Sequence, residues 1–272
     1  MTQRRRFLTI GQIDATGIRG PHARELIDMS KAKAPLFKDI QIDVLEKITK
    51  KDLGAIVENI GFDEDWTLTL EIFPEVNIHI SYFYYGGEFG DTEAELKFLY
   101  SGNRVYLISG KELFSFNEII INFIERRLKN EPPLSTSYKE NTELMQKNLK
   151  KRRMALKFLN PEDKSELEKF LEAKVVKTDR EWKIKKEIFP NIFIELKYDE
   201  NQKELDTFYS GENLEKIGIY EIELLAIYLI NHILRFITLK NNLKDLPDIC
   251  YMVFSNMLLK EKNWEDRILK ED

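Results

Sequence analysis

Apolar and polar residues alternate along two adjacent segments of this chain, 66–72 and 76–82. Apolar residues at every second position are typical of half-buried β-strands, so these segments predict an antiparallel hairpin. A three-residue turn at 73–75 keeps both apolar sets on one face. It also places polar residues opposite each other: Thr69 with His79, and Thr67 with Ser81.

The same pattern occurs a second time, which indicates an internal duplication. Residues 66–74 recur at 182–190, displaced by 116 positions, with Trp, Glu, Ile, Phe and Pro in register. Residues 95–102 recur at 204–211, displaced by 109 positions, and both end in Tyr-Ser-Gly. Each copy therefore predicts one folding module.

Helical patterns flank the strands in both copies. A helix opens each copy, and the long helices 111–128 and 219–239 close them; 104–108 predicts a short fourth strand. The second long helix is apolar nearly all round, which favours a buried core helix over a membrane span. The fold class predicted is α+β: two tandem, pseudo-symmetric helix–antiparallel sheet–helix modules plus a C-terminal helix.

Five segments follow from this organisation. They are an N-terminal segment 1–42, module copy 1 at 43–129, a basic linker helix at 130–153, module copy 2 at 154–240, and a C-terminal helical extension at 241–272.

Composition narrows the class of protein. The net charge of −5 gives the chain as a whole no attraction to nucleic acid or anionic membranes. Its single cysteine, Cys250, excludes an internal disulfide and suits a reducing compartment, so we expect a cytoplasmic protein. The one basic run is a candidate nucleic-acid contact, although such runs are usually solvated helix faces: Lys147, Lys150, Lys151, Arg152 and Arg153.

The hairpin loop SYFYYGGEFGD, at 81–91, is the most distinctive stretch. The change of displacement from 116 to 109 makes the corresponding hairpin of the second copy seven residues shorter. The module therefore folds without this loop. An extended hairpin that packs on the N-terminal segment is the favoured explanation, and a binding role is the alternative. The candidate ligand or partner contacts are Tyr84, Tyr85, Glu88, Phe89, Asp91 and His79.

Candidate catalytic and metal-binding residues are sparse. Ser81, His79 and Glu71 share the polar sheet face, which permits a triad interpretation. The adjacency of Ser81 and His79 on one strand argues against it, and a solvated sheet face is favoured. The three histidines are isolated and no phosphate-binding loop occurs, so we expect no metal site and no cofactor.

Two polar pairs interrupt the apolar long helices at the same helical spacing: Asn122 with Arg126, and Asn231 with Arg235. Each arginine could bind an anionic ligand. An internal ion pair is favoured, because a buried charge needs a partner. The acids repeated in both copies are the candidates: Glu71 and Glu187, or Glu95 and Glu204.

Residues 72–100 resemble the C-terminal part of a domain-of-unknown-function family of anaerobic prokaryotes. The resemblance rests on Phe73-Pro74, on the glycine turn 86–89, and on Phe98-Leu99. It implies a prokaryotic origin and carries no activity.

These observations favour a non-enzymatic binding protein that engages a protein partner or a second copy of itself. Two alternatives stay open. One is nucleic-acid binding through 147–157, and the other is an enzyme with its site near the 81–91 loop.

Overall fold

The computed structural model of the 272-residue chain describes residues 5–86, 93–134, 140–241 and 246–260. The chain divides into two compact units. Unit 1 comprises residues 1–132 and 255–258, and unit 2 comprises residues 133–254 and 259–272. The division after Pro132 falls within the Pro-Pro pair that follows the first long helix.

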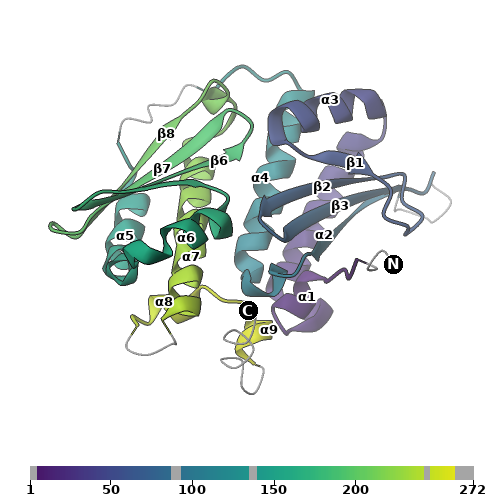
Figure 1. Ribbon diagram of the computed structural model, residues 1–272. Coiled ribbons are helices and arrows are strands. Elements are labelled where there is room, and N and C mark those ends of the chain that lie inside the picture. Colours follow the sequence, from purple (N-terminus) through teal and green to yellow (C-terminus); the bar gives the residue numbers. More distant parts are fainter. Residues whose placement is uncertain (1–4, 87–92, 135–139, 242–245, 261–272) are drawn as a thin grey trace. The chain divides into compact units, whose positions relative to one another are not determined.

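Unit 1 holds a four-stranded antiparallel sheet of order β1-β2-β3-β4 (Figure 1). Its elements are α1 (Ile10–Ile13), α2 (Pro21–Lys33), α3 (Ile42–Leu53), β1 (Ile56–Glu58), β2 (Trp66–Phe73), β3 (Val76–Tyr84), β4 (Ala94–Ser101) and α4 (Gly110–Leu128). Helix α2 packs on β4, and α4 packs on β3.

Unit 2 repeats the order of helices, four strands and a long helix around a second antiparallel sheet, β5-β6-β7-β8. Its elements are α5 (Glu143–Arg152), α6 (Lys164–Leu171), β5 (Lys174–Lys177), β6 (Glu181–Phe189), β7 (Ile192–Asp199), β8 (Glu204–Ser210) and α7 (Ile219–Lys240). The C-terminal extension forms the short helices α8 (Ile249–Met252) and α9 (Asn256–Leu259). The predicted fold class, α+β with two sheet modules and a C-terminal helix, is confirmed.

The predicted strand register is also confirmed, but the turn differs. Thr69 pairs with His79 and Thr67 pairs with Ser81. The turn has two residues, Pro74 and Glu75, because Phe73 pairs directly with Val76 after a bulge. The bulge supplies the extra residue that keeps both apolar sets on one face.

The fourth strand lies elsewhere than predicted. Residues 105–107 form a 3₁₀ turn, whereas β1, at 56–58, pairs with β2. Residues 56–58 are too few to show a period-two pattern, so alternation could not identify this strand.

Stacked aromatic side chains and the buried faces of the long helices make up the hydrophobic cores of the two units. In unit 1, Trp66 stacks on Tyr82 with ring centroids 5.2 Å apart, and Phe37 meets Trp66 edge-on at 5.3 Å. Helix α7 is long and apolar enough to cross a membrane by length and composition alone. In this structure 89% of its most apolar window is buried, as in the core helix of a globular unit.

The glycine of the repeated Tyr-Ser-Gly is needed for a steric reason. Gly102 adopts φ 113° and Gly211 adopts φ 126°, both in the region that favours glycine. A Cβ on Gly102 would lie 1.9 Å from the carbonyl oxygen of Glu75, and one on Gly211 would lie 2.0 Å from that of Asn191. The residue after the fourth strand of each unit, β4 or β8, therefore packs directly against the turn between the second and third strands.

Replacing Gly102 with alanine should lower the free energy of unfolding of unit 1 by roughly 2 to 4 kcal/mol, because positive φ and a backbone clash act together. Gly61 is the matched control. It has φ 89° and open space within 4 Å of the position that a Cβ would take, so Gly61→Ala should cost only about 1 kcal/mol. Urea denaturation measures both, and equal losses would contradict the steric role of Gly102.

Candidate binding site in unit 1

The polar sheet face of unit 1, predicted to be solvated, is buried at its centre, whereas Glu71 and Lys97 on the same face are exposed. Thr67, His79 and Ser81 are at most 1% exposed. The Phe7 ring meets the His79 ring edge-on at 5.0 Å and meets Phe62 at 5.5 Å. Segments remote in sequence thus cover the face, which the polar alternation of the strands could not reveal.

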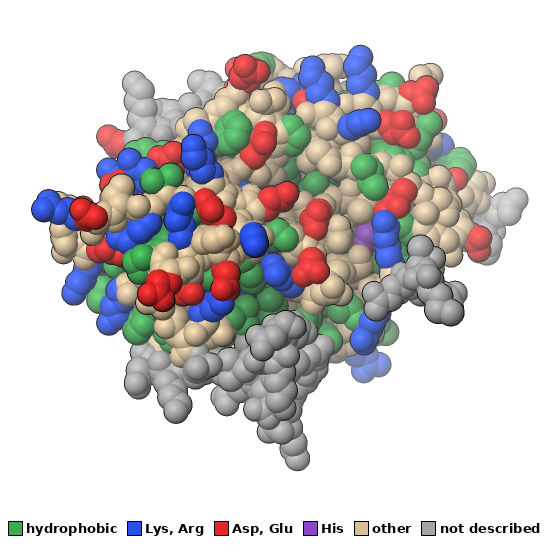
Figure 2. Space-filling model, in the orientation of Figure 1, with side chains coloured by type: hydrophobic (Ala, Val, Ile, Leu, Met, Phe, Trp, Pro, Cys, Tyr) green, Lys and Arg blue, Asp and Glu red, His purple; other side chains and the backbone are tan. Residues whose placement is uncertain are grey.

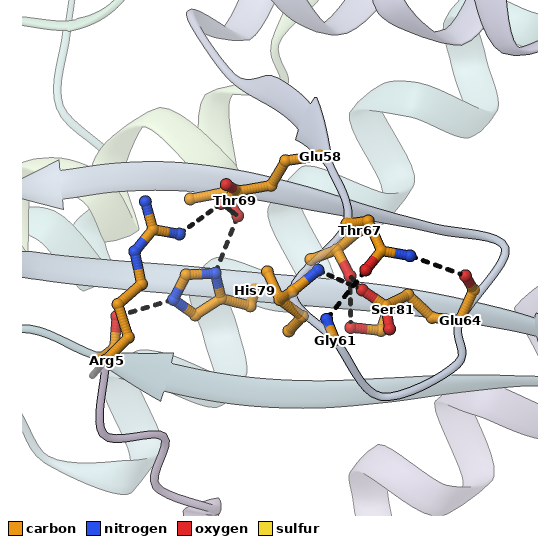
Figure 3. A network of polar contacts seen from close by, with 11 residues as sticks. Arg5, Glu58, Gly61, Glu64, Thr67, Thr69, His79 and Ser81 are labelled. Atoms are coloured by element: carbon orange, nitrogen blue, oxygen red, sulfur yellow. Dashed lines mark hydrogen bonds and ion pairs between the residues drawn. The ribbon is translucent and has the colours of Figure 1, made fainter. Parts of the chain in front are cut away.

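A chain of hydrogen bonds crosses this covered face (Figure 3). Arg5 Nη1 and Thr69 Oγ1 both donate to Glu58 Oε1, each at 2.7 Å. The Thr69 hydroxyl therefore accepts from His79 Nδ1, at 2.8 Å. This leaves His79 Nε2 as the acceptor for the Ser101 hydroxyl, at 2.8 Å. The bonds orient the imidazole and give every member a partner.

A second cluster fastens the 60–64 loop over the sheet. The Glu64 carboxylate accepts the backbone N–H of Ile60 and, at 2.7 Å, that of Phe62. It also accepts the Thr67 hydroxyl at 3.2 Å, and Thr67 bonds Ser81 at 2.7 Å. Burial raises the pKa of Glu64, but these bonds outweigh burial and hold the pKa below its usual range.

His79 is neutral at pH 7, because burial lowers its pKa to about 4. A neutral imidazole that accepts a serine hydroxyl resembles the base and nucleophile of a hydrolase. Ser101, however, is only 4% exposed. The adjacent cavity, about 540 Å³, is lined by Arg5, Phe7 and Glu58 with residues 59–62 and does not reach His79 or Ser101. The arrangement satisfies buried polar groups and offers no open site for a substrate.

The three residues of the triad interpretation are not brought together. Ser81 bonds Thr67, and Glu71 accepts the backbone N–H of Glu75 in the hairpin turn at 2.7 Å. The residues that do bond His79 are Thr69 and Ser101. Sequence reasoning missed Ser101, and its only signal was the repeated Tyr-Ser-Gly.

The candidate contacts of the 81–91 loop are described in part. Glu88, Phe89 and Asp91 lie outside the described residues. Tyr84 is 43% exposed and its hydroxyl donates to Glu93 at 3.2 Å, while the Tyr85 hydroxyl donates to Glu95 at 3.0 Å. His79 was predicted to contact a ligand or partner, but it is buried beneath Phe7 and cannot serve as a surface contact.

The basic candidates lie on or just after α5, which packs on α7 and β8 of unit 2. Arg152 is not available to nucleic acid, because it is 8% exposed and its Nε donates to Asn231 Oδ1 at 2.7 Å. Lys147 pairs with Glu143 at 2.6 Å, Lys150 and Lys151 are exposed, and Arg153 is half-buried. Acidic and basic side chains are interspersed over the face drawn in Figure 2.

The repeated acids Glu71 and Glu187 do not pair with the arginines of the long helices. Arg235 is fully buried and its Nε donates to the Val253 carbonyl at 3.1 Å. Glu71 and Glu187 instead accept backbone N–H groups of their hairpin turns, each at 2.7 Å. A carbonyl from the C-terminal extension thus replaces the expected carboxylate. Asn122 and Arg126 are half-buried.

A second hollow of unit 1 lies beside the edge strand β4, and we name it the β4 groove. Its volume is about 400 Å³. Two of its side chains are markedly exposed apolar groups, Ile18 at 84% and Ile27 at 48%. It is lined chiefly by Ile10, Ile18, Leu26, Ile27, Lys31 and strand residues 94–99.

No group of three or more His, Cys, Asp or Glu side chains suited to a metal ion occurs among the described residues. No protein-family model, curated protein or solved structure matches this chain. The resemblance of residues 72–100 to an uncharacterised family therefore stays a prediction.

Acid should destabilise unit 1 through His79. Its pKa of about 4 lies below the ordinary 6.5, so between these values only the unfolded chain binds the proton. The free energy of unfolding should therefore fall from pH 7 to pH 4 by on the order of 3 kcal/mol more than in the variant His79→Gln. Urea denaturation at both pH values measures this difference. Equal falls in the two proteins would show that protonation of His79 does not oppose folding.

Proposed function

We propose that this chain is a non-enzymatic cytoplasmic binding protein whose unit 1 engages a protein partner at the β4 groove. The observation that carries the proposal is the exposed apolar wall of a groove of ligand-binding size. Ile18 and Ile27 are 84% and 48% exposed beside a hollow of about 400 Å³. Exposed apolar side chains gathered at a hollow are characteristic of interaction sites.

The two alternatives have weaker support. Arg152 is buried in unit 2, so it cannot contact nucleic acid. Lys150 and Lys151 are the exposed cations in the middle of the basic run. Catalysis beside the 81–91 loop that uses His79 would need access to a side chain that is 1% exposed.

The substitution Ile27→Asp should weaken partner binding, because a carboxylate would be desolvated against an apolar surface. The tagged chain would be used to retain proteins from extracts of its own cells, and the retained protein would be identified by mass spectrometry. Titration of that purified protein should then give an affinity for Ile27→Asp at least about tenfold weaker than for the wild type.

Ile42→Asp is the matched control. Ile42 is 40% exposed, belongs to unit 1 and lies on α3 outside the groove, so its replacement should leave the affinity unchanged. If the partner is a second copy of the chain, light scattering should show a dimer that Ile27→Asp alone dissociates. Equal binding by both variants, or turnover of a substrate by the wild type, would refute the proposed function.

A further inference from the structure

The N-terminal segment already uses the outer edge of β4 for strand pairing. Leu8 N–H donates to the Tyr100 carbonyl at 2.8 Å, and Tyr100 N–H donates to the Leu8 carbonyl at 2.9 Å. Residues two apart on an antiparallel strand direct their backbone groups to the same side. The backbone N–H and C=O groups of Phe98 and Leu96 therefore also point away from β3. The Leu96 N–H donates to Ser30 Oγ at 2.8 Å.

Phe98 lies between Leu96 and Tyr100, whose outward N–H groups have hydrogen-bond partners. Among the described residues, neither the N–H nor the carbonyl of Phe98 has a hydrogen-bond partner on the outer edge. The strand pairing ends here because Thr9 is the N-cap of α1, so the residues after it are helical.

The open position lies in the β4 groove. Phe98 lines the groove together with the apolar side chains of Ile10, Leu26 and Ile27. The Phe98 N–H and C=O have the arrangement that pairs with one residue of a neighbouring strand, and an apolar hollow lies beside them. Together they are complementary to one residue of an extended chain. The backbone of that residue would bond Phe98, and its side chain would fill the hollow.

We propose that the occupant of the β4 groove is an extended protein segment, which inserts one aliphatic residue and pairs that residue's N–H and C=O with Phe98. This inference rests on the proposed function and specifies the partner's chemistry. Strand pairing is limited to a single residue. The outward backbone groups of Tyr100 already bond Leu8, and the Leu96 N–H already bonds the Ser30 hydroxyl.

The test uses N-acetyl-L-leucine N′-methylamide, which carries one aliphatic side chain between two peptide groups. The full chain would be labelled with ¹⁵N-phenylalanine and titrated to the solubility limit of the probe. The Phe98 amide proton should move downfield in a saturable manner, with a dissociation constant in the millimolar range expected of so small a ligand. The analogue methylated on the leucine nitrogen lacks the donor to the Phe98 carbonyl and should bind about tenfold more weakly.

Two variants locate the response. Ile27→Asp should abolish the Phe98 shift, whereas Ile42→Asp should retain it. Absence of a Phe98 shift in the wild type would overturn the inference. Equal affinity for the methylated analogue would also overturn it, because the groove would then recognise apolar surface without strand pairing.

The outcome is separable from that of the proposed function. A partner protein lost on Ile27→Asp, with no response of Phe98 to the probe, would leave the function standing and refute strand pairing. A Phe98 response with no retained partner protein would support the chemistry of the groove and refute the function.

Discussion

The two hydrogen bonds between Leu8 and Tyr100 fix the N-terminal segment on unit 1, and both hollows of that unit depend on them. On one side of this pairing, Arg5 and Phe7 cover the sheet face and close the His79 network. On the other side, Ile10 and helix α2 form a wall of the β4 groove. A segment with little regular structure thus decides which surfaces of the module are buried and which stay open.

The duplication provides a comparison within one chain. The position of His79 in unit 1 corresponds to Glu195 in unit 2, and the surrounding strand positions carry lysines. There Glu181 pairs with Lys197 at 2.8 Å and with Lys183 at 3.1 Å on a partly exposed face. Covering lysines of this kind is costly, because an ammonium group loses its hydration when buried. Hydroxyls and a neutral imidazole can be covered, since they satisfy one another.

Unit 2 resolves its buried polar groups in another way. Its long helix α7 is apolar, yet it carries Asn231 and Arg235 in the interior. Asn231 accepts from Arg152 of α5, and Arg235 donates to the carbonyl of Val253. Arg152, from the segment predicted as a basic linker, and Val253, from the C-terminal extension, therefore supply partners of the core helix, and both residues belong to unit 2.

Sequence patterns alone were enough to predict the duplicated α+β module, the two sheets and the pairing of Thr69 with His79. These features follow from period-two alternation and from repeated residues, which report local geometry directly. Strand β1 and the 3₁₀ turn at 105–107 escaped prediction, because segments of three residues carry no measurable period. The repeated Gly102 was visible as a repeat, but its steric reason was not.

What lies over each sheet face depends on tertiary contacts that no local pattern encodes. Alternation shows which side of a strand is polar, but it cannot show whether a remote segment such as 5–7 covers that side. The same limit applies to Glu71, whose partner is the backbone of its own turn and not a distant arginine. It applies equally to Phe98, whose outer edge is unpaired because the chain becomes helical after Thr9. Periodicity encodes local direction, whereas burial and partnership are set by chain segments far apart in sequence.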